Sequence, residues 1–308
     1  MTDLARASAI LREGVGGRLR SDVTIAPLTT FRLGGPAALY LEPDSIDDLR
    51  VVARAVHETG IPVVILGKGS NVLVSDGGID GLVLRLGRGF RWSARDGDTL
   101  TAGGAMPLPA LAGIALAHGL TGLEFGIAIP ATIGGAVRMN AGAHGRTLAD
   151  VTERVDVFDL STGGARSVAG ADAGFRYRGS GFGALDLVVG ARLGLEPGDP
   201  VAIRAAMDAA RAWRRETQPI AEPNCGSVFT NPPGDHAARL VDVTGCKGMR
   251  VGGAHVSDKH ANFIVADPGA SAADVLELIG LVRTAVEERW GIRLEPEVRL
   301  VGDFARDA

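Results

Sequence analysis

Residues 61–78 read IPVVILGKGSNVLVSDGG, a glycine loop between two apolar runs. The runs are short and bounded by turn residues, so we expect a buried strand at 61–66 and further strands in 72–78 and 81–86. The phosphate loops of Rossmann and Walker A sites lead into a helix, whose N-terminus holds the phosphate. Because this loop leads into another strand, both motifs are excluded. The backbone N–H groups from Gly67 to Asn71 can form a nest for a pyrophosphate. A tight hairpin turn explains this glycine-rich sequence equally well.

A second glycine-rich segment, GLEFGIAIPATIGGAVRMNAGAHG, covers residues 122–145. It is made of small residues with almost no charge, and Thr132 and Asn140 supply hydrogen-bonding groups. Glycine makes up 44 of the 308 residues, about twice the usual fraction. Such a surface allows close approach of a dinucleotide to the backbone. The alternative is a glycine-rich helix that packs closely on a sheet.

The remaining pattern predicts an α+β protein without internal repeats. Ser45 and Asp48 have the capping-box spacing that begins a helix, and Ser271 and Asp274 repeat it. The expected helices cover residues 45–60, 107–119, 199–217 and 271–290, and the expected strands cover 184–195, 261–267 and 292–302, with a hairpin at 151–168. The segment 196–200 is a plausible linker. We therefore divide the chain into an N-terminal helix and lead-in at 1–26, one domain at 27–196 and another at 197–308.

Composition limits the class of protein. The net charge is −4, and hydrophobic residues make up 46% of the chain, which favours a globular protein without a nucleic-acid or membrane partner. The chain has two cysteines, no secretory signal pattern and no apolar run of about 18 residues. These features predict a cytoplasmic location. No obligatory protein partner is evident.

The segment PNCGSVFTNP, residues 223–232, places two reactive side chains in one turn. Cys225 would act as a thiolate nucleophile, whereas Ser227 would donate or accept a proton. No His–Asn pair accompanies the cysteine in the way that a cysteine nucleophile requires. The two histidines of HVSDKH, residues 255–260, have a spacing that does not suit a helical metal site, so we expect no metal.

Eight motifs in fixed order resemble one known family. They are TTFRLGGPA, GKGSNVLV, the 122–145 segment, FRYRGS, RRETQP, GSVFTNP, SDKHANFIV and LEPEVRLVG, and they run from about Thr29 to Val301. Together they resemble the UDP-N-acetylenolpyruvoylglucosamine reductase (UDP-N-acetylmuramate dehydrogenase) family, in the shorter of its two types. The resemblance implies a PCMH-type (vanillyl-alcohol-oxidase-like) FAD-binding domain, followed by a C-terminal α+β substrate-binding domain.

The resemblance also implies a reaction. NADPH reduces FAD, and the reduced flavin passes hydride to the enolpyruvyl group of UDP-N-acetylglucosamine-enolpyruvate. The product, UDP-N-acetylmuramate, is a peptidoglycan precursor. The residues at the family's catalytic positions are Arg178, Ser227 and Glu297: Arg178 and a protonated Glu297 stabilise the enolate, and Ser227 donates the proton. This role favours Ser227 over Cys225, which we interpret as a packed side chain.

The expected contacts follow from the same motifs. The residues expected to bind FAD are Gly67, Lys68, Gly69, Ser70, Asn71, Thr132, Gly134, Gly135 and Asn140, and those expected to bind substrate are Tyr177 and Asn231. Alternation along the predicted last strand would place Glu295, Glu297 and Arg299 on one face.

The sequence departs from the family pattern at a few positions. Ala128 and Ala131 replace two glycines, His144 replaces an aromatic residue, and Thr230 replaces a basic residue near the expected diphosphate. Candidates to replace that charge are Lys247, Lys259 and Arg215. The alternatives to a reductase are a flavin oxidase of an alcohol or sugar and a non-catalytic FAD or UDP-sugar binding protein. The catalytic set favours the reductase, because binding alone needs no proton donor.

Overall fold

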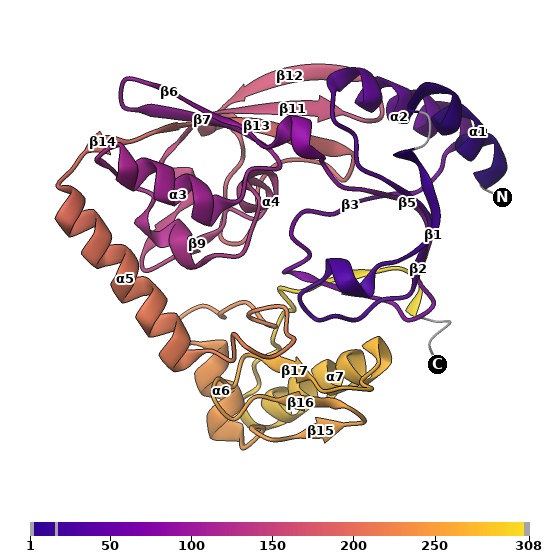
Figure 1. Ribbon diagram of the computed structural model, residues 1–308. Coiled ribbons are helices and arrows are strands. Elements are labelled where there is room, and N and C mark those ends of the chain that lie inside the picture. Colours follow the sequence, from indigo (N-terminus) through magenta and orange to yellow (C-terminus); the bar gives the residue numbers. More distant parts are fainter. Residues whose placement is uncertain (1–2, 16–17, 305–308) are drawn as a thin grey trace. The chain divides into compact units, whose positions relative to one another are not determined.

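A computed structural model describes residues 3–15 and 18–304 (Figure 1). The chain forms two compact units, each built from separate stretches of sequence. The first unit comprises Met1–Ser21, Leu39–Lys68 and Gly81–Trp213, and the second comprises Asp22–Ala38, Gly69–Asp80 and Arg214–Ala308. These units interleave, whereas the sequence-based ranges 1–26, 27–196 and 197–308 are continuous; the outer bounds at residues 1 and 308 lie outside the described residues. The chain changes unit inside strands β1 (Arg20–Thr24), β2 (Pro36–Leu41) and β5 (Ile79–Leu84), inside the glycine loop and inside helix α5 (Pro200–Thr217), and no linker composition marks these changes.

Two helices of the first unit pack on each other. They are α1 (Leu4–Val15) and α2 (Ile46–Thr59). The predicted capping box of α2 is confirmed, because Ser45 Oγ accepts a hydrogen bond from Asp48 N (3.1 Å) and the Asp48 carboxylate accepts one from Ser45 N (3.1 Å). Gly60 ends the helix in the left-handed conformation, with φ 64°. Arg18 donates two hydrogen bonds of 2.6 Å to the same carboxylate.

The predicted glycine loop joins two strands, as expected. A four-stranded sheet has the order β1 (Arg20–Thr24), β2 (Pro36–Leu41), β5 (Ile79–Leu84) and β3 (Val63–Ile65). β3 and β5 are parallel, with Val64 opposite Val83. After the loop the chain enters β4 (Val72–Val74), so no helix begins at the loop. The exclusion of the two helix-terminus phosphate motifs is confirmed.

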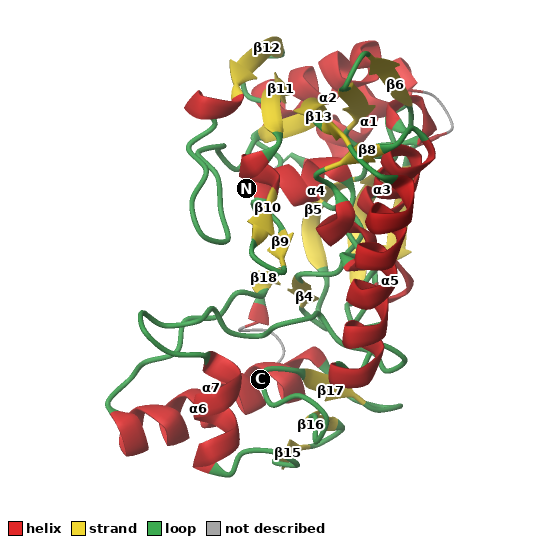
Figure 2. Cartoon of the chain, turned by 90° about the vertical axis from the view of Figure 1, so that its left-hand side faces the viewer, coloured by secondary structure: helices red, strands yellow, loops and turns green. Residues whose placement is uncertain are grey.

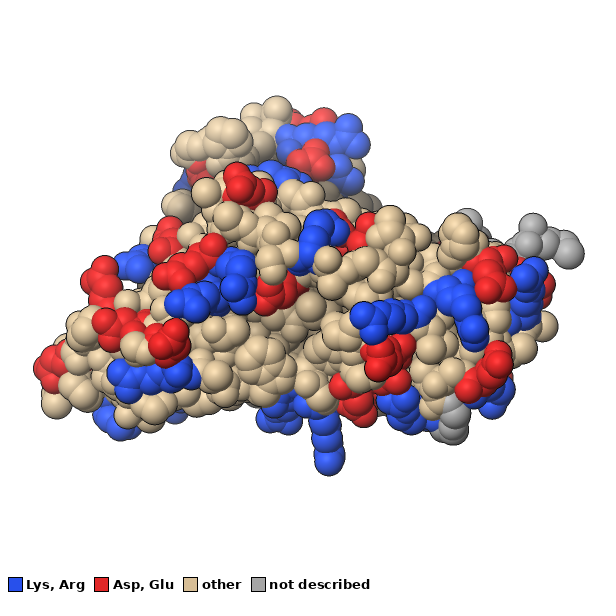
Figure 3. All heavy atoms as spheres, turned by 90° about the horizontal axis from the view of Figure 1, so that it is seen from above, with Lys and Arg blue, Asp and Glu red and all other residues tan. Residues whose placement is uncertain are grey.

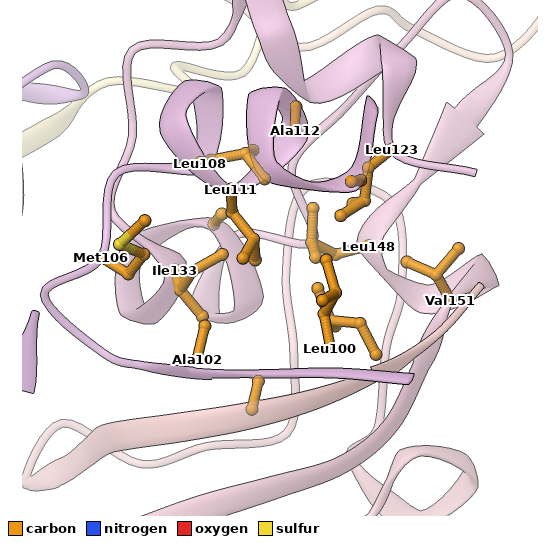
Figure 4. Packing of buried hydrophobic residues seen from close by; sticks show 14 of the residues in the cluster. Leu100, Ala102, Met106, Leu108, Leu111, Ala112, Leu123, Ile133, Leu148 and Val151 are labelled. Atoms are coloured by element: carbon orange, nitrogen blue, oxygen red, sulfur yellow. The ribbon is translucent and has the colours of Figure 1, made fainter. Parts of the chain in front are cut away.

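An antiparallel five-stranded sheet carries the main core of the first unit. Its order is β12 (Gly164–Ala169), β11 (Thr152–Asp159), β13 (Asp186–Gly194), β7 (Thr99–Gly103) and β6 (Ser93–Asp96). The helices α3 (Leu108–Ala117) and α4 (Ile133–Arg138) join this core, in which Leu100, Leu108, Leu111 and Ile133 are fully buried (Figure 4). Each such side chain contributes about 1.5–3 kcal/mol by burial. Two short pairs complete the unit: β8 (Leu120–Thr121) with β14 (Glu196–Pro197), and β9 (Gly142–Ala143) with β10 (Arg146–Thr147).

The second unit packs two helices on small sheets. Its elements are α6 (Ala237–Thr244), α7 (Ala272–Trp290), the antiparallel strands β15 (Arg250–Val251), β16 (Ala254–Val256) and β17 (Ile264–Ala266), and the parallel pair of β4 with β18 (Arg299–Val301). Helix α5 (Pro200–Thr217) contains the boundary between the units. Ser271 caps α7 as predicted, accepting from Asp274 N at 3.0 Å. Helices and strands are both abundant in the chain, so the predicted α+β class is confirmed (Figure 2).

The last predicted strand is much shorter than expected. β18 covers only three residues, and Glu297 lies before it. Both Glu297 N (2.7 Å) and Val298 N (3.4 Å) donate to Val228 O, which interrupts regular pairing at this point. The alternation that would place Glu295, Glu297 and Arg299 on one face therefore does not apply, and that prediction was wrong.

The surface carries charges of both signs. Lys or Arg and Asp or Glu side chains are interspersed on the face drawn in Figure 3, in keeping with the small net charge. Among residues 3–15 and 18–304, no helix combines the length and apolarity needed to cross a membrane.

We predict that Asp48→Asn lowers the free energy of unfolding at pH 7 by about 1–2 kcal/mol, because it removes the charge bound by Arg18. The guanidinium of Arg18 lowers the pKa of Asp48. A lowered folded pKa gives stability that is complete above the unfolded value of about 3.9 and is lost as the pH falls through the folded pKa. The free energies of unfolding of the wild type and Asp48→Asn, measured with urea, should therefore converge in acid. The control Asp47→Asn alters an exposed carboxylate, so its free energy of unfolding should stay within about 0.5 kcal/mol of the wild-type value. An equal loss of stability in both variants would contradict the prediction.

Candidate active site

The two glycine-rich segments meet in the first unit. A Cβ atom added to Gly67, just after β3, would lie 2.9 Å from Thr132 Oγ1 and 4.0 Å from Gly135 Cα. The end of the glycine loop thus lies against the start of α4 with almost no side chain between them. This bare backbone surface is what a dinucleotide needs for close contact. The residues present therefore fit FAD.

Gly134 has a different reason to be glycine. Its N–H donates to Gly104 O (2.9 Å), and an added Cβ would lie 3.0 Å from Val188 O on β13. α4 therefore packs so closely on the sheet that a side chain at Gly134 would push it away. At Gly134, close packing of a helix on a sheet explains the glycine. A contact of Gly134 with FAD stays a prediction. Thr132 caps α4 by accepting from Gly135 N at 3.3 Å.

The rest of the glycine loop, from Gly69 onward, belongs to the second unit. Gly69 has φ +69°, and an added Cβ would lie 2.1 Å from Leu28 O, so only glycine fits. Its carbonyl accepts from Thr30 N at 2.9 Å. Lys68 is exposed and Ser70 is half-buried.

Asn71 ends the loop and contacts a catalytic candidate. Its Nδ2 donates to the Glu297 carbonyl at 3.2 Å, and its own carbonyl accepts from Arg299 N at 3.2 Å. The side chain that was expected to bind FAD therefore holds the backbone of Glu297.

Asn140 holds the turn that carries Arg178. It is 6% exposed, its Nδ2 donates to Arg176 O (3.1 Å), and its Oδ1 accepts from Ala149 N (2.9 Å). Arg176 and Gly179 exchange both backbone hydrogen bonds, at 3.0 and 3.1 Å, which leaves Tyr177 and Arg178 at the tip of a two-residue turn. The side chain of Asn140 thus binds the backbone on both sides, and any contact with FAD stays a prediction.

Arg178 is fixed in an unusual conformation. Its φ is +55°, which costs about 1 kcal/mol or more for a residue with a side chain. Nη1 donates to Gly142 O at 3.2 Å, and the guanidinium lies 5.3 Å from the ring centre of Tyr177. Tyr177 is 58% exposed. Backbone strain of this kind gathers where a side chain must be aimed, which fits a group that binds a carboxylate.

His144 keeps a ring at a position where the family has an aromatic residue. Its φ is +53°, and its ring packs edge-on against Trp213 with 5.2 Å between the centres. The imidazole therefore packs on the ring of Trp213 in the edge-on arrangement that aromatic pairs favour.

Ser227 and Glu297 flank one short stretch of backbone pairing in the second unit. Val228 O accepts from Glu297 N (2.7 Å), and Phe229 forms a bridge with Pro296. Both Ser227 and Glu297 are half-buried. This pairing joins the two backbone segments that carry the Ser227 hydroxyl and the Glu297 carboxyl.

Cys225 is a buried structural residue, as predicted. It is 3% exposed within the cluster that includes Val228, Leu240 and Val275. Burial raises the pKa of the Cys225 thiol well above its ordinary value, and the nearby Glu297 charge raises it further. The thiol therefore stays protonated at neutral pH and is a poor nucleophile.

The lysines offered as replacements for the missing basic residue have partners of their own. Thr230 donates through N (2.9 Å) and Oγ1 (3.2 Å) to Glu295 O. Lys259 donates to Arg215 O at 2.5 Å, and Lys247 pairs with Asp242 at 2.9 Å.

Asn231 anchors the start of α6. Its Oδ1 accepts from Ala237 N at 3.0 Å. A contact between Asn231 and substrate stays a prediction. In the part of the chain that the structure describes, no group of three His, Cys, Asp or Glu side chains could hold a metal ion.

Asn262 is the residue that sequence reasoning missed. It lies in the quoted motif SDKHANFIV, is 4% exposed, and binds Phe229 beside the Ser227 turn. The sequence could have pointed to Asn262 because asparagine is rare in this chain: there are only five, at positions 71, 140, 224, 231 and 262.

Comparison with known proteins gives the family. Residues 218–301 match the UDP-N-acetylenolpyruvoylglucosamine reductase C-terminal domain, and residues 37–168 match an FAD binding domain. A UDP-N-acetylenolpyruvoylglucosamine reductase of Anaeromyxobacter sp. (strain Fw109-5) is 47% identical over 296 residues, covering 96% of this chain and 92% of the relative. The chain belongs to the UDP-N-acetylenolpyruvoylglucosamine reductase family. The resemblance found in the sequence is confirmed.

Further relatives agree with this family. UDP-N-acetylenolpyruvoylglucosamine reductase 2 of Symbiobacterium thermophilum is 45% identical, with 96% of each chain covered. The crystal structure of the Thermus caldophilus reductase gives a TM-score of 0.80 at 35% identity, covering 92% of this chain and 99% of that one. A berberine bridge enzyme variant, 14% identical, shares only the fold, with a TM-score of 0.50 over 63% of this chain and 44% of that one. The predicted FAD-binding domain followed by a family-specific C-terminal domain is confirmed.

We predict that Gly67→Ala weakens FAD binding at least about tenfold, because the new methyl group would separate the loop from Thr132 and Gly135. The FAD dissociation constant, measured by fluorescence titration of the stripped protein, tests this. The matched control is Gly113→Ala in α3, where an added Cβ meets nothing within 4 Å. The control should bind FAD as the wild type does, and equal binding by both variants would refute the role of the Gly67 contact.

Proposed function

We propose that this protein is an FAD-dependent oxidoreductase that uses NADPH to reduce UDP-N-acetylglucosamine-enolpyruvate to UDP-N-acetylmuramate, for peptidoglycan synthesis. Membership in the reductase family and the FAD-binding domain support this function. The observation that carries it is the pairing of the Ser227 and Glu297 segments beside a protonated Cys225. Bound FAD supplies hydride transfer from NADPH to the enolpyruvyl group.

The protein's own residues must handle charge and a proton. Hydride addition at the carbon β to a carboxylate moves negative charge onto that carboxylate, so a cation and a hydrogen-bond donor at this place lower the barrier. We assign the first role to the guanidinium of Arg178 and the second to a protonated Glu297. Ser227 then donates its hydroxyl proton to the α carbon.

The binding residues follow the two glycine-rich segments. We propose that the backbone at Gly67, Thr132 and Gly135 holds FAD. Lys68, Gly69, Ser70, Asn71, Gly134 and Asn140 are proposed as further FAD contacts. Tyr177 and Asn231 are proposed to contact substrate. In this assignment FAD binding belongs to residues 27–196, and residues 197–308 bind substrate together with Tyr177 and Arg178.

The setting of the enzyme is part of the same proposal. The substrate and NADPH are nucleotides of the cytoplasm, and we place the enzyme there. The reaction as written requires no protein partner.

An anaerobic titration tests this function. We expect the purified protein to be yellow, to bleach with one equivalent of NADPH, and to recover its colour only when UDP-N-acetylglucosamine-enolpyruvate is added. Bleaching without recovery would refute the substrate. A flavoprotein that NADPH does not bleach would favour a binding protein. In a separate aerobic assay without NADPH, oxygen consumption on addition of an alcohol or sugar would favour an oxidase.

We predict that Ser227→Ala leaves flavin reduction by NADPH intact but slows flavin reoxidation by the substrate by about 10³-fold or more, because the proton donor is lost. Stopped-flow absorbance follows each half-reaction separately. Cys225→Ala is the matched control two residues away, and we expect it to reoxidise at close to the wild-type rate. Unchanged reoxidation in Ser227→Ala would remove Ser227 from the mechanism.

A further inference from the structure

Asn262 binds the segment that follows Ser227 with both its backbone and its side chain. Val228 N donates to Asn262 O (2.9 Å), Phe229 N donates to Asn262 Oδ1 (2.9 Å), and Asn262 Nδ2 donates to Phe229 O (2.8 Å). The backbone N–H of Asn262 in turn donates to His260 Nδ1 at 3.2 Å. The residue is 4% exposed, so these bonds form with little access of water. Hydrogen bonds in such a place are costly to leave unmade.

The same hydrogen-bonded array continues to Glu297. The Val228 carbonyl accepts from Glu297 N, and Asn71 Nδ2 donates to the Glu297 carbonyl. Asn262 is therefore joined to Glu297 through a single intervening strand-like segment. Any shift of Phe229 and Val228 would move Ser227 relative to Glu297.

The turn before Ser227 cannot hold the serine by itself. Gly226 has φ +80°, a conformation that leaves the backbone free to adjust because glycine has no side chain. Asn224 Oδ1 accepts from Gly226 N at 2.9 Å and steadies this side of the turn. On the C-terminal side of Ser227, the three bonds to Asn262 add to the bond that Glu297 N donates to Val228 O.

Only an asparagine amide satisfies both backbone groups of Phe229 at this distance. Aspartate keeps the acceptor but loses the donor and adds a buried charge, and alanine loses both. Glutamine carries the same amide on a longer side chain, which would not fit the same geometry in a packed site.

We propose that Asn262 is a positioning residue for the proton transfer, in which its amide fixes Ser227 against Glu297. The inference rests on the proposed role of Ser227 as proton donor. Asn262 touches neither substrate nor FAD in this role and acts only through the backbone at Val228 and Phe229. Misplacing a reacting group by about 1 Å costs about 100-fold in rate, so loss of the amide should act mainly on the proton step.

The test compares half-reactions of the FAD-loaded protein. We expect Asn262→Asp and Asn262→Ala to be reduced by NADPH at the wild-type rate but to be reoxidised by UDP-N-acetylglucosamine-enolpyruvate about 10- to 100-fold more slowly, with Ala slower than Asp. The solvent deuterium isotope effect on reoxidation should rise, because proton transfer becomes slower. The matched control is Ser271→Ala, which removes the N-cap of α7 in the same unit and lowers stability without touching the Ser227 turn.

Each outcome decides the inference. Slow reoxidation with a larger isotope effect in Asn262→Asp, and normal reoxidation in Ser271→Ala, supports it. Normal reoxidation of Asn262→Asp, or an equal loss in Ser271→Ala, overturns it while leaving the proposed function intact. Wild-type protein that the substrate does not reoxidise overturns both. If Asn262→Ala fails to retain FAD, the reoxidation rate of the isosteric Asn262→Asp variant still tests the inference.

Discussion

The hydrogen bond from Glu297 N to Val228 O is the contact on which the catalytic half of the second unit depends. It joins two segments far apart in sequence, one of which carries the proposed proton donor and the other the proposed enolate stabiliser. The pairing lies on an apolar cluster formed by α6, α7 and the small sheet, which buries Val228 and Phe229 almost completely. A buried backbone bond cannot be exchanged for one to water without a large cost, so the apolar core keeps the pairing in place.

The glycines of the first unit serve two separate physical needs. Gly67 lets the loop approach the start of α4, whereas Gly134 lets α4 approach the sheet. We propose that the first need is that of a ligand surface, whereas the second is that of close packing, and a sequence pattern does not distinguish them. Arg178 shows the opposite case, because a bulky residue keeps a positive φ that glycine would adopt without strain. Strain of this kind is typical of sites where the side chain itself is required.

Three asparagine side chains hold backbone segments that lie far from them in the sequence. Asn71 binds the carbonyl of Glu297, Asn140 binds that of Arg176, and Asn262 binds both backbone groups of Phe229. Each of these bonds ends on the backbone that carries a catalytic candidate or on its close neighbour. Arg176, Phe229 and Glu297 lie outside regular helices and strands, and a side-chain amide, which has both a donor and an acceptor, can hold such backbone in place. The asparagines that hold this backbone therefore need their particular side chain, as the catalytic candidates do.

The sequence by itself determined the elements whose signals are local. The capping boxes at Ser45 and Ser271 connect residues three apart, and they predicted where α2 and α7 begin. The ordered motifs gave the family, the cofactor class and the catalytic candidates, which residue spacing alone would not have singled out. Only the tertiary structure decided where β18 begins, how the units interleave, and that Asn71 and Asn140 bind backbone. Their partners lie 226 and 36 residues away, and hydrogen bonds at such separations depend on packing that no local pattern encodes.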